Sequence, residues 1–206
     1  MIKKIFVIFF VSLFCYNLKA EYIVGNVHFK SKKYKDLNVI GEARFEDVQS
    51  DVIVITGPFQ FANLRATELI VTGPVAASEK GKFDKVVITG ELILSDSIMN
   101  VLSVTGSCEL NSVKVINQAR VTGFFIAENS IFDNLCISGK KVVLNNSRAS
   151  NLLIKKEPSL NQPQKLIVKG KTYIKEVVFE SGQGEIHIYG KAVVIDNVTG
   201  AKITCH

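Results

Sequence analysis

Glycine returns along the middle of this chain at nearly constant intervals. Each glycine closes a short run of apolar and β-branched residues, as in Leu69-Ile-Val-Thr-Gly73 and Val86-Val-Ile-Thr-Gly90. Such glycines are spaced 16 or 17 residues apart at Gly25, Gly41, Gly57, Gly73, Gly90, Gly106, Gly123 and Gly139. A fixed period of this length is typical of a repeat architecture, and it constrains the fold more strongly than any local propensity.

Apolar residues also recur at fixed places around each glycine, at two and four residues before it and at two and four residues after it. This is the period of a strand, so these side chains are predicted to point into a core. The predicted inward columns are Leu37, Ile53, Leu69, Val86, Leu102, Ala119 and Leu135; Val39, Ile55, Val71, Ile88, Val104, Val121 and Ile137; Val27, Ala43, Phe59, Val75, Leu92, Cys108 and Phe125; and Phe29, Phe45, Phe61, Ala77, Leu94, Leu110 and Ala127. A third, weaker segment adds Tyr34, Ser50, Ala66, Met99, Val115, Phe132 and Ala149.

Three short strands in 16 or 17 residues describe one coil of a parallel β-solenoid, in which coils hydrogen-bond to each other at about 4.8 Å. We therefore predict an all-β, single-domain parallel β-solenoid (β-helix) of about 11 coils and roughly 50 Å. Helical repeats are disfavoured because they need roughly 33 to 47 residues per unit. The glycine is expected at a tight corner, and polar pairs such as Asn129-Ser130 and Asn146-Ser147 at another.

The repeat becomes irregular after Gly139. Residues 157–164 contain two prolines and predict a longer loop, after which the pentad resumes at residues 166–170. Another coil is predicted to end at Gly190, after the turn Gly182-Gln-Gly184.

Residues 1–20 have the pattern of a secretory signal peptide. Lys3 and Lys4 precede the apolar run 5–14, and Ala20 supplies a small residue before the cut. We expect residues 21–206 to form one exported solenoid domain of the periplasm or cell surface, without a transmembrane segment. Cleavage removes three lysines, so the net charge falls from +6 to +3. We expect no nucleic-acid partner for this mildly basic chain.

Three cysteines remain after residue 20, too few for a disulfide framework. Cys108 falls in an inward column, whereas Cys136 falls in an outward one, so these two are not expected to pair. Cys136 or Cys205 is predicted to be the accessible thiol, able to join two molecules or to remain a free cysteine.

The residues of the chain predict no enzyme, no cofactor and no metal site. His28 and His187 lie at outward strand positions and His206 at the end of the sequence, where each is expected to be a solvated surface imidazole. The carboxylates are scattered over different columns, and no phosphate-binding loop, nucleophile elbow or zinc spacing is present.

The outward side of the glycine-terminated strand is the candidate interaction face. It carries a row of hydroxyls beside a row of apolar residues: Thr56, Thr72, Thr89, Thr105 and Thr122, with Val54, Ile70 and Val87. An unbroken apolar stripe on an exported protein favours association. The alternative is that β-branched residues simply suit exposed strands.

A basic cluster, Lys30, Lys32, Lys33 and Lys35, lies in the first predicted coil. It is interpreted as a charged guard of an open sheet edge. The functional alternative is contact with a polyanion such as lipopolysaccharide or teichoic acid.

The pentads at residues 53–57, 86–90 and 102–106 resemble those of bactofilins, the polymer-forming bacterial cytoskeletal proteins. The resemblance covers most of residues 22–200 and implies a right-handed parallel solenoid that stacks end to end without nucleotide. Left-handed hexapeptide-repeat acyltransferases differ, because their coils hold 18 residues and their histidine sits on a loop.

These observations favour an exported, non-enzymatic structural or interaction protein of the bacterial envelope. Such a rod would present stacked faces to itself, to envelope polymers or to a host surface. The alternative is a carbohydrate-binding or carbohydrate-active β-helix protein, with its site in the late loops, residues 157–164 or 180–185.

Overall fold

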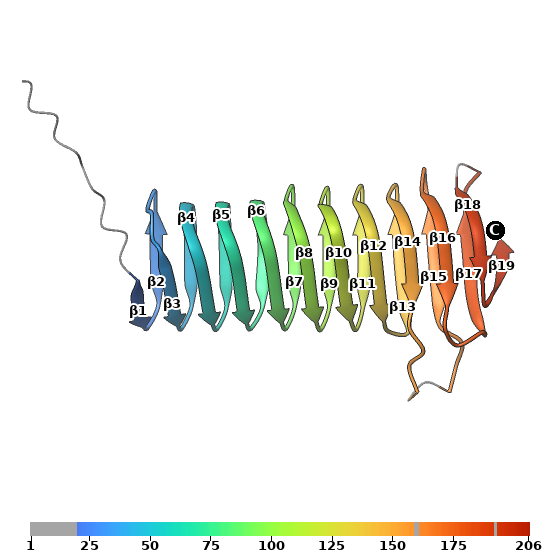
Figure 1. Ribbon diagram of the computed structural model, residues 1–206, viewed down its shortest axis with the longest axis horizontal. Helices are drawn as coiled ribbons and strands as arrows, with labels where there is room; N and C mark the ends of the chain where they lie inside the picture. Colours follow the sequence, from blue (N-terminus) through green and yellow to red (C-terminus); the bar gives the residue numbers. More distant parts are fainter. Residues whose placement is uncertain (1–19, 159–160, 192) are drawn as a thin grey trace, which may run out of the picture.

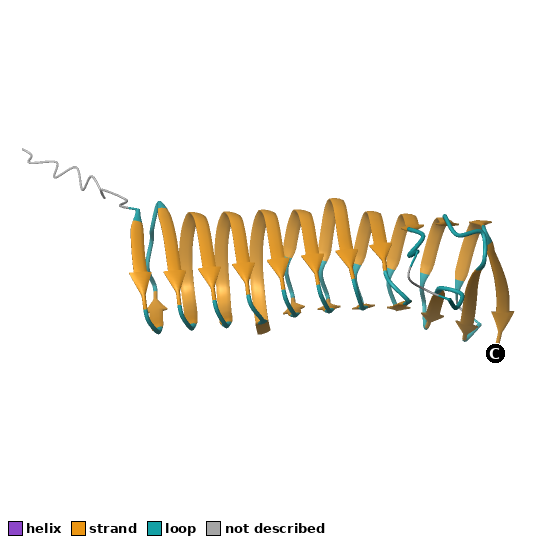
Figure 2. Ribbon diagram, turned by 90° about the horizontal axis from the view of Figure 1, so that it is seen from below, coloured by secondary structure: helices purple, strands orange, loops and turns teal. Residues whose placement is uncertain are grey.

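The computed structural model describes residues 20–158, 161–191 and 193–206. These residues form an all-β chain in which every strand pairing is parallel, and a single sheet winds into a β-solenoid of about 11 turns. Figures 1 and 2 show the coils following one another along the axis of a rod. The predicted solenoid fold is therefore confirmed, whereas the predicted signal peptide falls on residues 1–19, which lie outside the described part.

The strands of the described residues are β1 (Glu21–Val24), β2 (Val27–Lys30), β3 (Asp36–Ile40), β4 (Ala43–Thr56), β5 (Phe59–Thr72), β6 (Val75–Thr89), β7 (Leu92–Ser95), β8 (Ile98–Thr105), β9 (Cys108–Asn111), β10 (Lys114–Thr122), β11 (Phe125–Glu128), β12 (Ile131–Ser138), β13 (Lys141–Asn145), β14 (Arg148–Ile154), β15 (Lys165–Lys169), β16 (Tyr173–Phe179), β17 (Gly184–Tyr189), β18 (Val194–Thr199) and β19 (Ala201–Cys205).

Equivalent residues of successive coils lie directly beside each other. Val39 pairs with Ile55, Ile55 with Val71, and Val71 with Ile88, all four of them buried. The predicted inward columns are buried from the second coil onward, except that the side chain of Ala77 lies outside the described set. Buried Ser78 takes the place facing Leu94 instead. The core is thus one continuous apolar column shared between neighbouring coils.

The longer coils accommodate their extra residue in β-bulges. The 17-residue interval from Gly73 to Gly90 contains a register shift after Val75, between Val75 and Glu79 against β5 and between Val75 and Ser78 against β7. The interval from Gly106 to Gly123 contains another, between Val115 and Gln118. A bulge places one extra residue against a regular neighbour, so the rows stay in register on both sides of it.

The predicted glycine corner is tightly packed. Gly57 has φ 141°, a conformation that residues with a side chain rarely adopt, and its N–H donates to the Thr72 carbonyl oxygen at 2.9 Å. A Cβ on Gly57 would overlap the carbonyl oxygen of Gly41, the equivalent residue one coil earlier. The same crowding repeats from Gly41 to Gly139. Glycine is therefore needed both for its dihedral angle and for the space it leaves.

A second corner has left-handed residues that are not glycine, among them Asp47, Asn63, Asp96, Asn129 and Asn146. Asn and Asp tolerate this conformation better than most residues. Just after this corner the later coils bury a hydroxyl that accepts a backbone N–H from the preceding coil. These bonds run from Gly81 to Ser97 (2.8 Å), Val113 to Ser130 (3.1 Å), Ser130 to Ser147 (3.1 Å) and Ser147 to Thr172 (3.2 Å).

The late pentads lie on a different side of the coil from the early ones. Leu166 pairs with Val142, which follows Gly139, so residues 166–170 do not continue the strand that ends in the glycine row. Gly170, with φ 62°, follows Lys169, the partner of Asn145, and so stands at the second corner. The reading of these pentads as a continuation of the same unit is wrong, because glycine there serves the left-handed corner that Asn146 serves one coil earlier.

The crowding at the glycine corner can be measured by comparing Gly57→Ala with Gly25→Ala. Gly25 has a related conformation, with φ 121°, but an added Cβ there meets no described atom within 4 Å. We expect Gly25→Ala to lower the free energy of unfolding by about 1 kcal/mol through backbone strain, and Gly57→Ala to lower it by about 3 kcal/mol or more because the clash adds to the strain. Urea unfolding followed by circular dichroism measures both, and equal losses would contradict the stacking of glycine on glycine.

Candidate functional site

The predicted threonine row exists as one straight line of exposed side chains. Thr56, Thr72, Thr89, Thr105 and Thr122 pair in register on five successive coils. Beside it Val54, Ile70 and Val87 also pair in register and are partly exposed. The two rows together make a flat, mildly apolar surface over the first half of the rod.

The apolar row changes in its second half, where Cys136 lies between Arg120 and Leu153. Cys136 is only 8% exposed, so the prediction that it could be the accessible thiol is wrong. Its column does face outward, but the thiol is short and its register neighbours carry longer side chains. Cys108 is fully buried, and burial raises the pKa of its thiol well above the usual range.

Cys205 is the exposed cysteine of the three that are described, and all three are free. It pairs with Ile188 in the last described coil, so it belongs to an inward column that has no further coil over it. An intermolecular disulfide, if one forms, is therefore expected at Cys205.

The four predicted lysines do not form one patch. Lys30 lies on β2 with its Nζ 3.3 Å from Glu46, and this contact is the main cause of the lowered pKa of the Glu46 carboxyl. Lys32 and Lys33 lie in the corner after β2, and Lys35 is exposed beyond it. Lys30 pairs with Glu46 of the next coil, whereas Lys33 pairs with Gln49 and so belongs to a different row.

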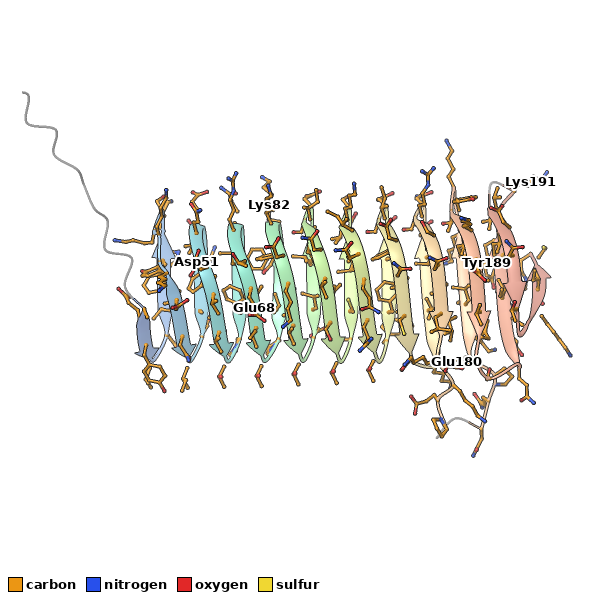
Figure 3. The ribbon with its side chains drawn as sticks, in the orientation of Figure 1. Asp51, Glu68, Lys82, Glu180, Tyr189 and Lys191 are labelled. Carbon is orange, nitrogen blue, oxygen red and sulfur yellow. The ribbon has the colours of Figure 1, made fainter. Side chains whose placement is uncertain are left out.

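The row that starts at Lys33 is a basic stripe that sequence reasoning missed. In register it continues through Gln49, Arg65, Lys82, Ile98, Lys114, Ile131 and Arg148. No ion pair within the described residues includes Lys33, Arg65, Lys82, Lys114 or Arg148. Figure 3 places Lys82 at one long edge of the rod. At about 4.8 Å per coil these five cations span roughly 34 Å.

The two late interruptions of the repeat meet at the opposite, glycine corner. The segment 155–164 follows β14, and the segment 180–183 follows β16, whose Phe179 pairs with Ile154. The Glu180 carboxylate accepts the Lys156 N–H at 3.1 Å, which ties the loops together. Figure 1 shows the described parts of the 155–164 segment projecting from the rod, and Figure 3 labels Glu180 beside them.

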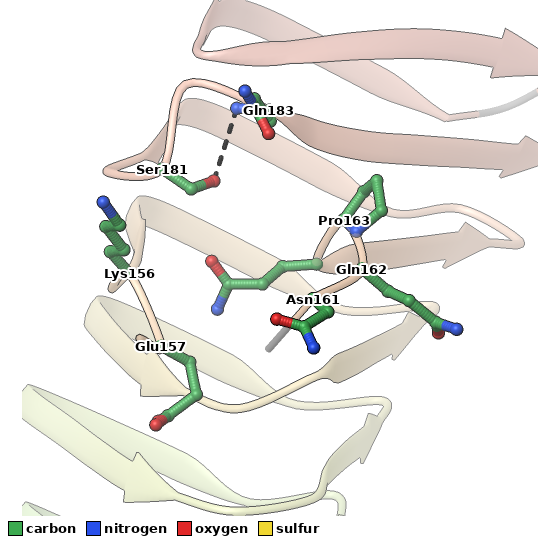
Figure 4. Close-up of a pocket in the computed structure, with 8 residues that line it drawn as sticks. Lys156, Glu157, Asn161, Gln162, Pro163, Ser181 and Gln183 are labelled. Carbon is green, nitrogen blue, oxygen red and sulfur yellow. Dashed lines mark hydrogen bonds between the residues drawn. The ribbon is translucent and has the colours of Figure 1, made fainter. Parts of the chain in front are cut away.

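A cavity of about 340 Å³ lies between these loops, as Figure 4 shows. Its lining is polar: Lys156, Glu157, Asn161, Gln162, Pro163, Gln164, Ser181 and Gln183. A second cavity of about 580 Å³ adjoins it, because Pro163 and Gln183 line both. The alternative carbohydrate hypothesis predicts a site in residues 157–164 or 180–185, and described residues of both segments line this hollow.

Gln164 forms the most unusual part of this hollow. Its side chain is 3% exposed, and its Nε2 donates to the carbonyl oxygens of Gly139 (2.9 Å) and Lys155 (2.8 Å). Its Oε1 is buried and has no hydrogen-bond partner among the described residues. Because the two donor bonds fix the amide, they also fix the direction in which this acceptor points.

His187 lies at an outward position as predicted, but its side chain is only 23% exposed because the imidazole belongs to a small cluster. Its Nδ1 lies 3.0 Å from His206 Nε2 and its Nε2 lies 3.3 Å from Glu185 Oε2. The Glu185 carboxyl has a lowered pKa, chiefly through the hydrogen bond with His187 and secondly through Lys165. His206 also stacks on Tyr189, with 4.5 Å between ring centroids. Pairing of β17 with β19 brings these groups together, and single-strand alternation does not reveal it.

Among the described residues no group of three His, Cys, Asp or Glu side chains is arranged to hold a metal ion. Nor does this part of the chain contain a helix of the length and hydropathy that a bilayer crossing requires. Comparison with protein-family models, with curated proteins and with solved structures finds no match.

The placement of the cysteines predicts their order of reactivity. In the native protein we expect a maleimide to modify Cys205 at least about 100-fold faster than Cys108 or Cys136, because the buried thiols react only after local opening. Peptide mapping by mass spectrometry measures each site, and labelling in urea provides the reference in which all three react. Modification of Cys136 at the rate of Cys205 would contradict the burial described here.

Proposed function

We propose that this protein is an exported, non-enzymatic structural rod of the bacterial envelope that associates end to end, in the manner its bactofilin-like pentads imply. The observation that supports this most directly is the state of the terminal strands. Within the described residues β1 and β2 at one end, and β18 and β19 at the other, each pair with a strand on one side only. An unpaired edge offers a row of free N–H and C=O groups to another strand.

The side chains at these ends support the same function. Ile203 in β19 stands in an inward column, paired with fully buried Ile186, yet it is 50% exposed. At the other end Val27 and Phe29 are inward but only partly buried. Joining two rods would cover this apolar surface and extend the backbone ladder in one step. Equivalent inward positions inside the rod are buried because a neighbouring coil lies on both sides of them.

This proposal is tested by placing a charge on the apolar end. Wild-type protein is expected to sediment as end-to-end assemblies in analytical ultracentrifugation, and Ile203→Lys is expected to shift it to the monomer because the ammonium group would be buried at the junction. Thr204→Lys is the matched control, since Thr204 faces outward beside His187. Circular dichroism confirms that both variants stay folded. A wild-type rod that remains monomeric at high concentration would rule the proposal out.

The basic stripe supports a second role, contact of the rod with an envelope polyanion. Five cations along one edge, none of which forms an ion pair within the described residues, add their potentials. Ile98 and Ile131 between them, each 43% exposed, offer apolar contact to a lipid or sugar chain. Teichoic acid, a polymer with regularly spaced phosphates, would lie along the rod axis, whereas lipopolysaccharide would present its clustered phosphates to part of the stripe. This arrangement extends the predicted lysine cluster from one coil to eight coils.

Binding to purified lipopolysaccharide and teichoic acid tests this contact. The triple variant Arg65→Gln, Lys82→Gln and Lys114→Gln is expected to weaken binding by about tenfold or more, with a reduced dependence on salt. The control variant Lys140→Gln, Lys171→Gln and Lys175→Gln removes the same charge from other exposed positions. If both triple variants lose the same affinity for the polyanion, then net charge and not the position of the stripe determines binding, and the proposed contact is wrong.

A further inference from the structure

Three exposed isoleucines lie in consecutive coils at the basic stripe. Ile98 and Ile131 occupy positions of the stripe itself, and both pair in register with Lys114 of the coil between them. Each of these two is 43% exposed, and Ile116, on the same strand as Lys114, is 38% exposed. A single exposed apolar residue is ordinary, whereas a group of them marks an interaction site. We call Ile98, Ile116 and Ile131 the isoleucine patch.

A β-bulge accompanies the third member of the patch. On β10 the register shifts between Val115 and Gln118, so the two residues between them fall outside the regular pairing with both flanking coils. Ile116 follows buried Val115 and is exposed. Two residues after the stripe position, the flanking coils carry polar Asn100 and Asp133 instead. The bulged coil is therefore the one of the three that adds an apolar side chain next to the stripe.

Cations flank the isoleucine patch along the rod axis. The stripe runs through Lys82, Ile98, Lys114, Ile131 and Arg148 on five successive coils, so cations and isoleucines alternate. At about 4.8 Å per coil, successive cations lie roughly 9.6 Å apart with an isoleucine between them. None of these three cations forms an ion pair within the described residues. Proteins that lie on a membrane surface combine basic side chains with apolar ones that enter the headgroup region, as amphipathic helices do.

Nearby carboxylates favour a lipid partner over a soluble polyanion. Asp84, Asp96 and Asp133 are exposed, and each lies two residues from a stripe position. Their charges cancel part of the field of the cations, so attraction by charge alone is weakened. The isoleucines add an apolar contact that a water-soluble chain of phosphates cannot use and that the acyl chains of a lipid can use.

The shape of this edge suits a flat surface. Register pairing holds the five stripe positions in one line along the rod, and Figure 3 places Lys82 at that long edge. Because the strands fix the positions of the isoleucines, all three can reach a planar bilayer together. Little backbone freedom is lost on binding, which favours affinity.

We propose that this edge binds the surface of an anionic lipid bilayer, with the isoleucine patch entering the headgroup region and Lys82, Lys114 and Arg148 contacting lipid phosphates. The rod then lies flat, with its axis parallel to the membrane. This binding mode rests on the polyanion contact proposed above and narrows the partner to a lipid surface. Each basic residue near such a surface strengthens binding by roughly fivefold, and the isoleucines add a component that salt does not screen.

Cosedimentation with vesicles tests the proposal. The purified protein is expected to bind vesicles of equimolar phosphatidylglycerol and phosphatidylcholine, and not vesicles of phosphatidylcholine alone. The double variant Ile98→Gln and Ile131→Gln is expected to weaken binding by about tenfold or more, because it removes apolar area from the contact. Ile40→Gln with Ile93→Gln is the matched control: these residues are 41% and 37% exposed but lie on β3 and β7, away from the stripe. The control should bind as the wild type does, and circular dichroism checks that both variants fold.

Fluorescence tests the insertion of the patch directly. The chain contains no tryptophan, so Ile116→Trp places a single reporter in the patch. Its emission is expected to shift to the blue when the anionic vesicles are added, because the indole moves from water into the headgroup region, where tryptophan is favoured. Ile93→Trp is the control reporter on β7, and its emission should not shift.

The proposal is wrong if the Ile116→Trp emission stays unchanged on vesicles that bind the protein, or if the two double variants lose the same affinity. Binding to teichoic acid without binding to anionic vesicles would also overturn it, while leaving the proposed polyanion contact intact. Binding to neither would overturn both.

Discussion

Stacking in register is the constraint on which everything else in this rod depends. A residue's closest neighbours are the equivalent residues of the coils before and after it, about 4.8 Å away. Each inward side chain therefore completes the burial of the next, as Val39, Ile55, Val71 and Ile88 do in order. The same rule makes the glycine row obligatory, since the space of each missing side chain is filled by the carbonyl of the preceding glycine. Stacking in register also means that an outward residue type that recurs in each coil forms a line along the surface of the rod.

The fold could be predicted from the sequence because its information is local and repeated many times. Alternation with period two marks the inward residues of one coil, and the glycine spacing transfers that marking to the next. Prediction was wrong where neighbouring coils decide the outcome. Cys136 points outward as predicted, yet Arg120 and Leu153 on either side leave it 8% exposed. Gly170 matches the pentad motif but serves the second corner, because an insertion had moved the register by part of a coil.

Among the candidate surfaces, too, some could be predicted from the repeat and others required the register between coils. The threonine row was visible in the sequence because it sits next to the glycine that defines the repeat. The basic stripe was not, since its cations are interrupted by Gln49, Ile98 and Ile131 and lie at a corner that glycine does not mark. Aligning all outward positions on the second corner would have revealed it. The contact of His187 with His206 likewise needs the pairing of β17 with β19, which only the full register supplies.

Insertions at a corner explain why the hollow between segments 155–164 and 180–183 lies where it does. A solenoid tolerates extra residues between strands, because a loop that leaves and rejoins the same corner keeps the ladder on both sides. An insertion within a strand would instead shift every inward residue of the following coil. Gln164 shows how the corner remains closed: its amide donates to Gly139 and Lys155, carbonyls that the inserted loop would otherwise leave without a side-chain donor. The oxygen of that same amide is buried and has no hydrogen-bond partner among the described residues, so closing the corner leaves one acceptor of Gln164 unsatisfied there.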